Sequence, residues 1–400
     1  MISFEKAKEL VIQNIKPVDL CKLALSESRG AVLADDVYAP RNIPLRRNSA
    51  MDGFAFKLGE FNESEDISRF EFQIIDEIPG KGKDVKSLKK VQCHKVFTGS
   101  PLPDHIDTVI PKEDILISGS LVNIKIKPKV GKNIRAAGED LKRGELALCK
   151  GTVLGPAEIG LLASCGKMTI DAYKRPKIAV LPTGDEICKI DDPEAFDKTI
   201  DSNSHIISSL LSDLNIDAMI LPICKDSREE ILSALEILND CDGLITTAGI
   251  SVGEDDLVLE SLQKFGAKLI FSKVAIKPAR PTTFLLYGSK PVFCLPGNPV
   301  AAMVAFMEIF TPGLKKLMGY RDFEHEYLSA VLESPLKSTD ERTHFIRAVA
   351  KVKDGFIHAE SLPFQGSGIL KSMARANAII VQPPNSPAMH AGDRVMVHLF

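Results

Sequence analysis

The chain has 400 residues, of which 44% are hydrophobic and 26% are charged, and its formal net charge is −3. This length is too great for one ordinary core and predicts roughly two to four domains. The composition is typical of a soluble globular protein, and the lack of a basic excess argues against a nucleic-acid binder.

The amino terminus and the cysteines both predict a cytoplasmic location. Residues 1–6 are mixed in charge and lack the apolar core of a signal peptide. The most apolar run, Val300 to Met307, is too short to cross a bilayer, so no membrane association is expected. The 8 cysteines include no C-x-x-C pair, which is typical of reduced thiols and gives no zinc site.

The first part of the chain predicts a helix followed by a β-rich region. Residues 3–15 place apolar side chains on one helical face behind Ser3, a suitable N-cap. Short apolar or alternating runs between residues 60 and 130 are separated by Gly, Pro and Asp, which indicates strands. The 5 lysines of residues 81–90 fit a solvated loop or a binding patch, and the interspersed acid and glycines favour the loop. Residues 156–164 predict a short helix.

Residues 177–320 alternate between apolar strands and helices. Strands are expected at 177–181, 218–222, 244–247, 268–271, 283–286 and 292–295, and helices at 203–214, at 299–310 and near Asp226 and Asp256. This alternation predicts a doubly wound parallel α/β domain with its site beyond the carboxyl ends of the strands. Residues 325–400 return to a period of two, with a hairpin signal at Asp354-Gly355, and predict a small β-barrel or sandwich.

The stretch from Leu244 to Asp256 is the most informative one. A buried strand runs into a glycine-containing loop, and a helix opens near Asp256. Such a junction directs backbone N–H groups at one point, which suits a phosphate. The acids Glu254, Asp255 and Asp256 would repel a bare anion, so the stretch predicts a phosphate bound with a divalent cation.

Three other loops of this domain carry polar groups. Pro182–Glu186 follows a buried strand, and its acids suit either magnesium binding or simple capping of the next element. Residues 273–281 hold three cations among apolar residues and prolines, which favours anion binding over a solvated charge run. Residues 296–299 form a rigid turn before a helix and by themselves predict no more than a turn.

The order of these motifs along the whole chain resembles the molybdopterin molybdenumtransferase family, to which the gephyrin E domain belongs. The motifs are Ser49–Ala55, Thr98–Pro103, Asn133–Asp140, Pro182–Glu186, Ile250–Asp256, Lys277–Pro281 and Pro296–Val300. The resemblance implies a homodimer of four-domain chains. The expected domains are 1–44 with 141–174 as a helical linker and dimerisation domain, 45–140 as an inserted β-rich lobe, 175–322 as a molybdopterin-binding α/β domain similar to molybdopterin adenylyltransferases, and 323–400 as a C-terminal β-barrel.

The implied reaction is magnesium-dependent hydrolysis of adenylylated molybdopterin, with release of AMP and insertion of molybdate into the dithiolene. By resemblance, Asp256 and Glu186 are the metal and hydrolysis residues, with Asp185 beside them. Cations to neutralise charge and carboxylates to hold them suit the hydrolysis of a phosphoanhydride. Docking to molybdopterin adenylyltransferase and to molybdoenzymes is also implied.

The remaining site residues are likewise implied by the resemblance. Molybdate donors are Lys277, Arg280, Arg347 and Ser367. Residues at the phosphate side of the pterin are Gly249, Ser251 and Gly253, with Pro296, Gly297, Asn298 and Pro299 opposite. Other pocket residues are Thr183, Gly184, Asp226 and Lys273. The inserted lobe is expected to supply Asp52, Thr98, Arg135 and Asp140 to the site of a second subunit.

Three positions depart from the family pattern. Ala248 replaces a glycine that is more common before Gly249, which reduces the freedom of the backbone there. Arg280 replaces a lysine, which keeps the charge and changes the donor geometry. Ala301 stands where a serine donor is common.

Two other functions stay open at this point. An adenylyltransferase acting on molybdopterin is one, although stand-alone adenylyltransferases lack the lobe and barrel expected here. A scaffold that binds partner peptides, as the gephyrin E domain does, is the other.

Overall fold

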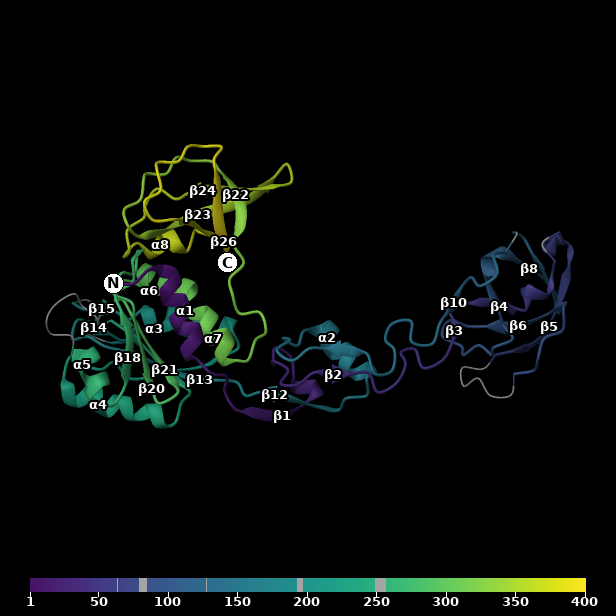
Figure 1. The fold of residues 1–400 in the computed structure, drawn as a ribbon, viewed down its shortest axis with the longest axis horizontal. Coiled ribbons are helices and arrows are strands. Elements are labelled where there is room, and N and C mark those ends of the chain that lie inside the picture. The colour runs from purple at the N-terminus through teal and green to yellow at the C-terminus, as the bar shows by residue number, and fades with distance from the viewer. Residues whose placement is uncertain (63, 79–84, 127, 193–196, 249–256) are drawn as a thin grey trace.

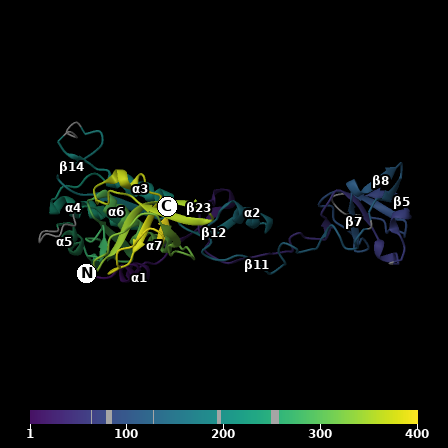
Figure 2. The same cartoon turned by 90° about the horizontal axis from the view of Figure 1, so that it is seen from above.

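The computed structural model describes residues 1–62, 64–78, 85–126, 128–192, 197–248 and 257–400. It is elongated, with an α/β domain and a small barrel at one end and a β-rich lobe at the other (Figure 1). A narrow linker of short antiparallel strand pairs joins the two ends, and the view from above shows the same separation (Figure 2).

A six-stranded sheet forms the centre of the α/β domain, in the order β16-β13-β17-β21-β20-β18. Its strands are β13 (Lys177–Pro182), β16 (Asp217–Ile220), β17 (Gly243–Thr247), β18 (Lys268–Ser272), β20 (Thr283–Tyr287) and β21 (Lys290–Leu295). The first four strands in the sheet are parallel, as predicted, but β20 runs antiparallel to both of its neighbours. The reason is the two-residue turn at Gly288-Ser289, which can join only antiparallel strands.

Helices cover both faces of this sheet, as a doubly wound domain requires. They are α3 (Asn203–Asp213), α4 (Arg228–Leu235), α5 (Leu257–Lys264), α6 (Pro299–Ala305) and α7 (Thr311–Leu317). Along β13, Ile178 and Val180 belong to one buried cluster, whereas Ala179 and Leu181 belong to the other. Alternate side chains of a strand point to opposite faces, so a strand that is apolar throughout needs cover on both sides.

The predicted helices begin close to the expected residues. At the start of α3, the carboxylate of Asp201 accepts a hydrogen bond from the backbone N–H of Ser204. The expected helix 299–310 is divided into α6 and a π-helical segment, Phe306–Phe310, before α7 continues it. No helix in the described ranges is both long and apolar enough to cross a membrane.

The C-terminal region is a closed barrel. Its strands are β22 (Leu328–Leu332), β23 (Thr343–Lys353), β24 (Phe356–Ser361), β25 (Ala378–Gln382) and β26 (Arg394–Leu399), with β19 (Ile276–Lys277) added at one side and a short helix α8 (Leu370–Met373). Closure comes from the pairing of β23 with β25 as well as with β24. The predicted hairpin is confirmed, because Asp354 and Gly355 both have positive φ angles between β23 and β24.

The amino-terminal half forms the linker and the lobe. In the linker, β1 (Leu20–Ala24) pairs with β12 (Thr169–Tyr173), β2 (Val37–Tyr38) pairs with β11 (Leu146–Leu148), and α2 spans Pro156–Ser164. In the lobe, β4 (Gly53–Phe56), β5 (Glu71–Glu77), β6 (Gln92–Val96), β7 (Thr108–Pro111), β8 (Ile115–Ser118) and β9 (Leu121–Ile124) form one sheet. Next to it, β3 (Asn48–Ser49) pairs with β10 (Ile134–Arg135).

The first helix, α1 (Phe4–Asn14), lies away from the linker to which the sequence assigned it. Ser3 caps it as predicted, since its side chain accepts from the backbone N–H of Lys6. Its apolar face is buried in the main core of the α/β domain, and Phe4 contacts Phe345 of the barrel edge-on. Of the described α-helices, α2 is therefore the one within the linker segments.

A buried polar cluster joins the α/β domain to the barrel. We call Glu308, His325, Tyr327 and His398 the Glu308 cluster. Glu308 lies in the π-helical segment and is fully buried. The hydroxyl of Tyr327 donates to its Oε2 at 2.9 Å, and Nδ1 of His398 lies 2.7 Å from its Oε1. The ring of His325 is 4.3 Å from that of His398. Because these buried polar groups hydrogen-bond to one another, they favour one arrangement of the α/β domain relative to the barrel.

The cluster predicts a loss of stability in mild acid. Burial, aided by His398, lowers the pKa of His325 from 6.5 to about 4. The native state then binds fewer protons than the unfolded state between these values, so stability falls as the pH drops from 6.5 towards 4. The free energy of unfolding is expected to fall by about 3 kcal/mol over this pH range because of His325. His325→Gln keeps a donor for the carbonyl of Met307 and should flatten this part of the pH profile of urea unfolding. An unchanged profile would contradict the assignment.

Candidate functional site

An acidic cavity of about 820 Å³ lies at the carboxyl ends of the parallel strands. Its acids are Glu186, Asp201 and Asp226, and no lysine or arginine lines it among the described residues. Thr247 at the end of β17 and the turn Pro296–Pro299 form other parts of its wall. The position agrees with the rule for open α/β sheets.

Gly184 makes room for the carboxylate of Glu186. Its φ angle is +136°, and a Cβ built on it would lie 2.6 Å from Oε2 of Glu186. The Glu186 carboxylate therefore lies over the glycine, and it would have to move if residue 184 carried a Cβ.

Gly184→Ala is therefore expected to displace the Glu186 carboxylate without unfolding the chain. A displacement of about 1 Å in a catalytic site typically costs up to about 100-fold in rate. We expect the release of AMP from adenylylated molybdopterin, measured with magnesium and molybdate present, to fall roughly 10- to 100-fold. Gly266→Ala is the matched control, because Gly266 also has a positive φ and the nearest atom to its Cβ is 3.9 Å away. Equal activity of the two variants would contradict this role for Gly184.

Asp185 and Asp226 stand close to Glu186. The backbone N–H of Asp226 donates to Oδ1 of Asp185 at 3.4 Å. Desolvation, followed by repulsion from Asp185 and Glu186, raises the pKa of Asp226. Carboxylates that repel one another in this way favour a bound cation. Within the described ranges, however, no three His, Cys, Asp or Glu side chains are grouped closely enough to hold a metal ion.

Part of the predicted site lies outside the described residues. This applies to Gly249, Ser251 and Gly253 of the phosphate loop and to the acids Glu254, Asp255 and Asp256. The residue before them, Ala248, has a φ angle of 77°, a left-handed conformation that favours glycine. Ala248, which replaces the glycine more common in the family, therefore has a strained backbone conformation.

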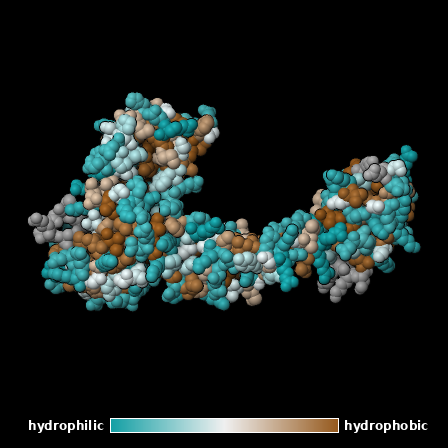
Figure 3. All heavy atoms as spheres, in the orientation of Figure 1, coloured by the Kyte–Doolittle hydropathy of each residue, from teal (hydrophilic) through white to brown (hydrophobic). Residues whose placement is uncertain are grey.

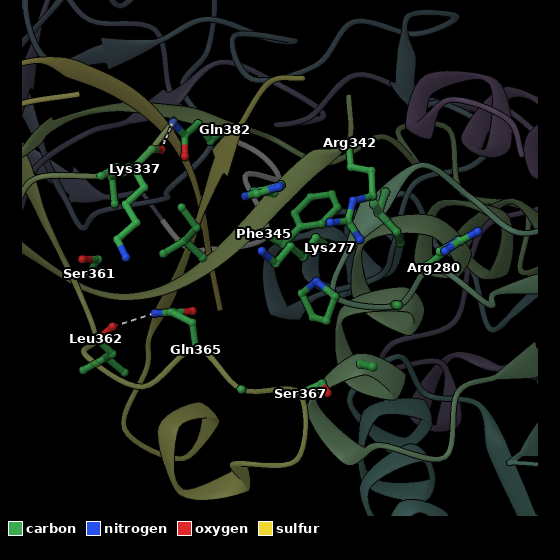
Figure 4. Close-up of a pocket in the computed structure, with 18 of the residues that line it drawn as sticks. Lys277, Arg280, Lys337, Arg342, Phe345, Ser361, Leu362, Gln365, Ser367 and Gln382 are labelled. Carbon is green, nitrogen blue, oxygen red and sulfur yellow. Dashed lines mark hydrogen bonds between the residues drawn. The ribbon is translucent and has the colours of Figure 1, made fainter. Parts of the chain in front are cut away.

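A basic cavity of about 800 Å³ adjoins the acidic one and shares Pro281, Pro296 and Asn298 with it. It lies between the α/β domain and the barrel (Figure 4). Lys277 and Arg280 line it from the segment that joins β18 to β20, and Lys337, Arg342 and His344 line it from the barrel. None of its described lining residues is acidic. Two neighbouring cavities thus carry opposite charge.

Arg342 is the cation of this cavity whose charge is compensated. It forms an ion pair with Asp340, which also lies 3.1 Å from Nε2 of His344. The hydrogen bond from Arg342 holds the pKa of Asp340 well below its usual range. Among the described residues, Lys277, Arg280 and Lys337 have no ion-pair partner. These three are the cations available to an oxyanion.

Outside the lobe, five described residues of the predicted site line neither cavity, namely Thr183, Gly184, Asp185, Lys273 and Arg347. Lys273 is exposed and lines neither of them, and Thr183 is fully buried behind the acidic one. Arg347 is also fully buried, and its guanidinium donates to the carbonyls of Phe364 and Gly366 and to the hydroxyl of Ser372. Through Nε and Nη2, Arg347 holds the loop that places Ser367 in the basic cavity, whereas its buried Nη1 has no hydrogen-bond partner among the described residues.

The predicted residues of the lobe lie far from these cavities in the same chain. Asp52 accepts hydrogen bonds from the backbone and the hydroxyl of Thr98, at 2.7 and 2.8 Å, and these bonds lower the pKa of Asp52. Arg135 and Asp140 are exposed. The space-filling view shows open space between the lobe and the barrel, and the linker connects the lobe to the α/β domain (Figure 3).

Several lining residues were missed by reasoning from sequence. On the acidic side they include Asp201 and Asn203, which follow a short parallel pair, β14 (Ile187–Cys188) and β15 (Thr199–Ile200). On the basic side they are Lys337, Arg342, His344, Gln365 and Gln382. The polar cluster Asp201-Ser202-Asn203 at the start of α3 could have indicated a wall of the acidic cavity. Strand periodicity alone does not show which barrel residues line the basic cavity.

Comparisons with known proteins agree with this architecture. Three family models match: MoeA N-terminal region (domain I and II) at residues 2–166, Probable molybdopterin binding domain at 179–316, and MoeA C-terminal region (domain IV) at 329–400. The molybdopterin molybdenumtransferase of Haemophilus influenzae is 30% identical over 409 residues, covering 100% of this chain and 99% of its own. That of Staphylococcus epidermidis is 30% identical over 399 residues, covering 100% and 95%.

A solved structure shares the whole fold. The molybdopterin biosynthesis moeA protein from Pyrococcus horikoshii OT3 superposes with a TM-score of 0.86 at 26% identity, and each chain is covered to 100%. Since sequence relatives, family models and this structure all extend over the full length, the chain belongs to the molybdopterin molybdenumtransferase family.

Proposed function

We propose that this chain is a molybdopterin molybdenumtransferase that hydrolyses adenylylated molybdopterin with magnesium and inserts molybdate into its dithiolene. The observation that carries the proposal is the pair of adjoining cavities of opposite charge. An acidic cavity suits a cation and the phosphates that it neutralises, and a basic cavity free of acids suits a tetrahedral dianion. The reaction needs a site for the cation and phosphates and a site for molybdate at the same time.

The acidic cavity supplies the groups for the hydrolytic half. Glu186 and Asp226 would hold Mg²⁺ together with Asp256, which lies outside the described residues. When bound, Mg²⁺ would neutralise the negative charge that develops on the phosphates. Glu186, with Asp185 next to it in the chain, would orient the attacking water and accept its proton. Water attacks one phosphorus of the anhydride, the bond from that phosphorus to the bridging oxygen breaks, and AMP and molybdopterin each leave with one phosphate group.

The basic cavity receives molybdate. Lys277 and Arg280 are exposed cations without described ion-pair partners, and Ser367 lies across from them (Figure 4). Cations and hydroxyl groups are suitable donors to an oxyanion. Ala301 also lines this cavity and provides no donor where relatives often have serine. Where the two cavities join, the two thiols of the dithiolene would bind the molybdenum and displace one oxo group of molybdate, which takes up their protons and leaves as water.

The proposal includes a cytoplasmic homodimer. Asp52 and Thr98 are preorganised on an exposed surface at the far end of an elongated chain, which fits a role in a second copy's site. Arg135 and Asp140 would act with them. Docking of the molybdopterin adenylyltransferase and of molybdoenzymes also belongs to this proposal.

The test is a reconstitution. Purified chain given adenylylated molybdopterin, magnesium and molybdate should release AMP and yield cofactor that activates an apo-molybdoenzyme. Absence of AMP release under these conditions would refute the proposal. Consumption of ATP with molybdopterin alone would instead support adenylyl transfer.

A further inference from the structure

The linker is packed against the α/β domain, and we call this contact the joint. Val32 of the linker belongs to the main buried core of the α/β domain, and Val153 and Tyr173 pack against that core. The backbone N–H of Arg321, beyond α7, donates to the carbonyl of Gly151 in the linker at 3.0 Å. Two domains are expected to move relative to each other unless the interface between them is apolar and well packed. The shared core therefore indicates a joint that holds one angle.

Gly319, two residues after α7, brings the two parts of the joint into close contact. Its φ angle is +80°, and a Cβ built on it would lie 2.2 Å from Cδ2 and from Cε2 of Tyr173. Tyr173 is half-buried on β12, which pairs with β1, and Nζ of Lys150 lies 5.8 Å from the centre of its ring. The aromatic ring of the linker therefore lies directly on the backbone of the α/β domain.

Two other glycines form similar contacts across the joint. Gly151 has a φ angle of +81°, and its Cβ would lie 2.7 Å from the backbone nitrogen of Arg321. Gly30 has a φ angle of +76°, and its Cβ would lie 2.2 Å from Nδ2 of Asn215, which follows α3. Nη2 of Arg175 donates to Oδ1 of Asn215 at 3.0 Å and restrains this side chain. At all three positions the backbone conformation favours glycine, and an added Cβ would push the two parts apart.

The lobe lies at the far end of the linker, so a small rotation at the joint becomes a large displacement of the lobe (Figure 1). In the proposed function the lobe brings Asp52 and Thr98 to the site of a second copy, and such groups must be held within about 0.5 Å of their working positions. We propose, on the basis of that function, that Gly30, Gly151 and Gly319 are positioning residues. They fix the angle between the linker and the α/β domain and thereby align the lobe with the second copy's cavities.

Gly319→Ala tests this role in the full-length protein. The added methyl group should turn the linker away from the α/β domain and lower kcat for AMP release roughly 10- to 100-fold, as a displacement of about 1 Å in a catalytic site does. The KM for molybdate should stay unchanged, because the described lining of the basic cavity includes no residue of the lobe. Gly166→Ala is the matched control. Gly166 also follows a helix, has a φ angle of +76°, and has no described atom within 4 Å of its Cβ.

A distance measured within one chain reports the angle of the joint directly. Spin labels at the exposed positions Ala157 in α2 and Asp213 in α3, in labelled chain diluted with unlabelled chain, should give one narrow distance distribution in the wild type and in Gly166→Ala. Gly319→Ala should shift or broaden it. In a Tyr173→Ala background, which lacks the ring, Gly319→Ala should change the distance and AMP release no more than Gly166→Ala does. This rescue separates a contact that sets the angle from a general loss of stability.

Gly151→Ala gives a second route to the same result, because its Cβ would meet the backbone of Arg321. A shifted distance together with slower AMP release in either variant supports the proposal. An unchanged distance in both variants overturns it, and so does a shifted distance with AMP release at the wild-type rate. If the wild-type protein releases no AMP, the proposed function fails, and the distances alone then decide whether these glycines set the angle: a shift supports this role, and no shift overturns it.

Discussion

Glu186→Gln is expected to reduce AMP release by about 100-fold or more. Glutamine keeps the size of the side chain, and Gly184 still leaves room for it. The negative charge is lost, however, so the acidic cavity attracts a cation less strongly and loses a group that can accept a proton. Initial rates measured over a magnesium titration should show a lower maximum and a higher magnesium requirement.

The same variant should bind molybdate normally, because Glu186 lines the acidic cavity and is absent from the basic one. Glu236→Gln is the matched control, since Glu236 is exposed at the end of α4 and lines neither cavity. AMP release within about threefold of the wild-type rate in Glu186→Gln would remove this residue from the proposed site.

Glu308→Ala is expected to lower the free energy of unfolding by about 3–5 kcal/mol, as removal of one partner from a buried charged network typically does. The change leaves the Tyr327 hydroxyl and Nδ1 of His398 without their acceptor and opens a cavity beside the π-helical segment. It also removes a link between the α/β domain and the barrel, whose contact encloses the basic cavity. Urea unfolding followed by circular dichroism measures the loss.

Glu333→Ala provides the comparison on the barrel surface. Glu333 pairs with Lys353 and His358, but the pair is accessible to solvent and contributes little. Tyr327→Phe should cost about 1 kcal/mol, because a single hydrogen bond is lost and no charge is left unpaired. A similar small effect for Glu308→Ala and Glu333→Ala would show that the cluster does not hold the two parts together.

The sequence by itself determined the local structure of this protein and the family of its site. Ser3, Asp354-Gly355 and the strand β13 were predictable, because capping, tight turns and side-chain periodicity depend on residues close together in the chain. The motifs around Glu186, Lys277 and Pro296 were also recognisable. Each follows a strand of one sheet, and the carboxyl ends of parallel strands meet at one edge.

Only the tertiary structure decided which of these groups share a cavity. A period of two shows which residues share a face of a strand, but barrel closure and domain packing determine what that face meets. This is why Arg347 proved to be a buried support for the loop of Ser367, and why Lys337 and Gln382 were missed. The separation of acids from cations into adjoining cavities likewise arises from contacts between residues more than 50 positions apart, which local sequence patterns do not specify.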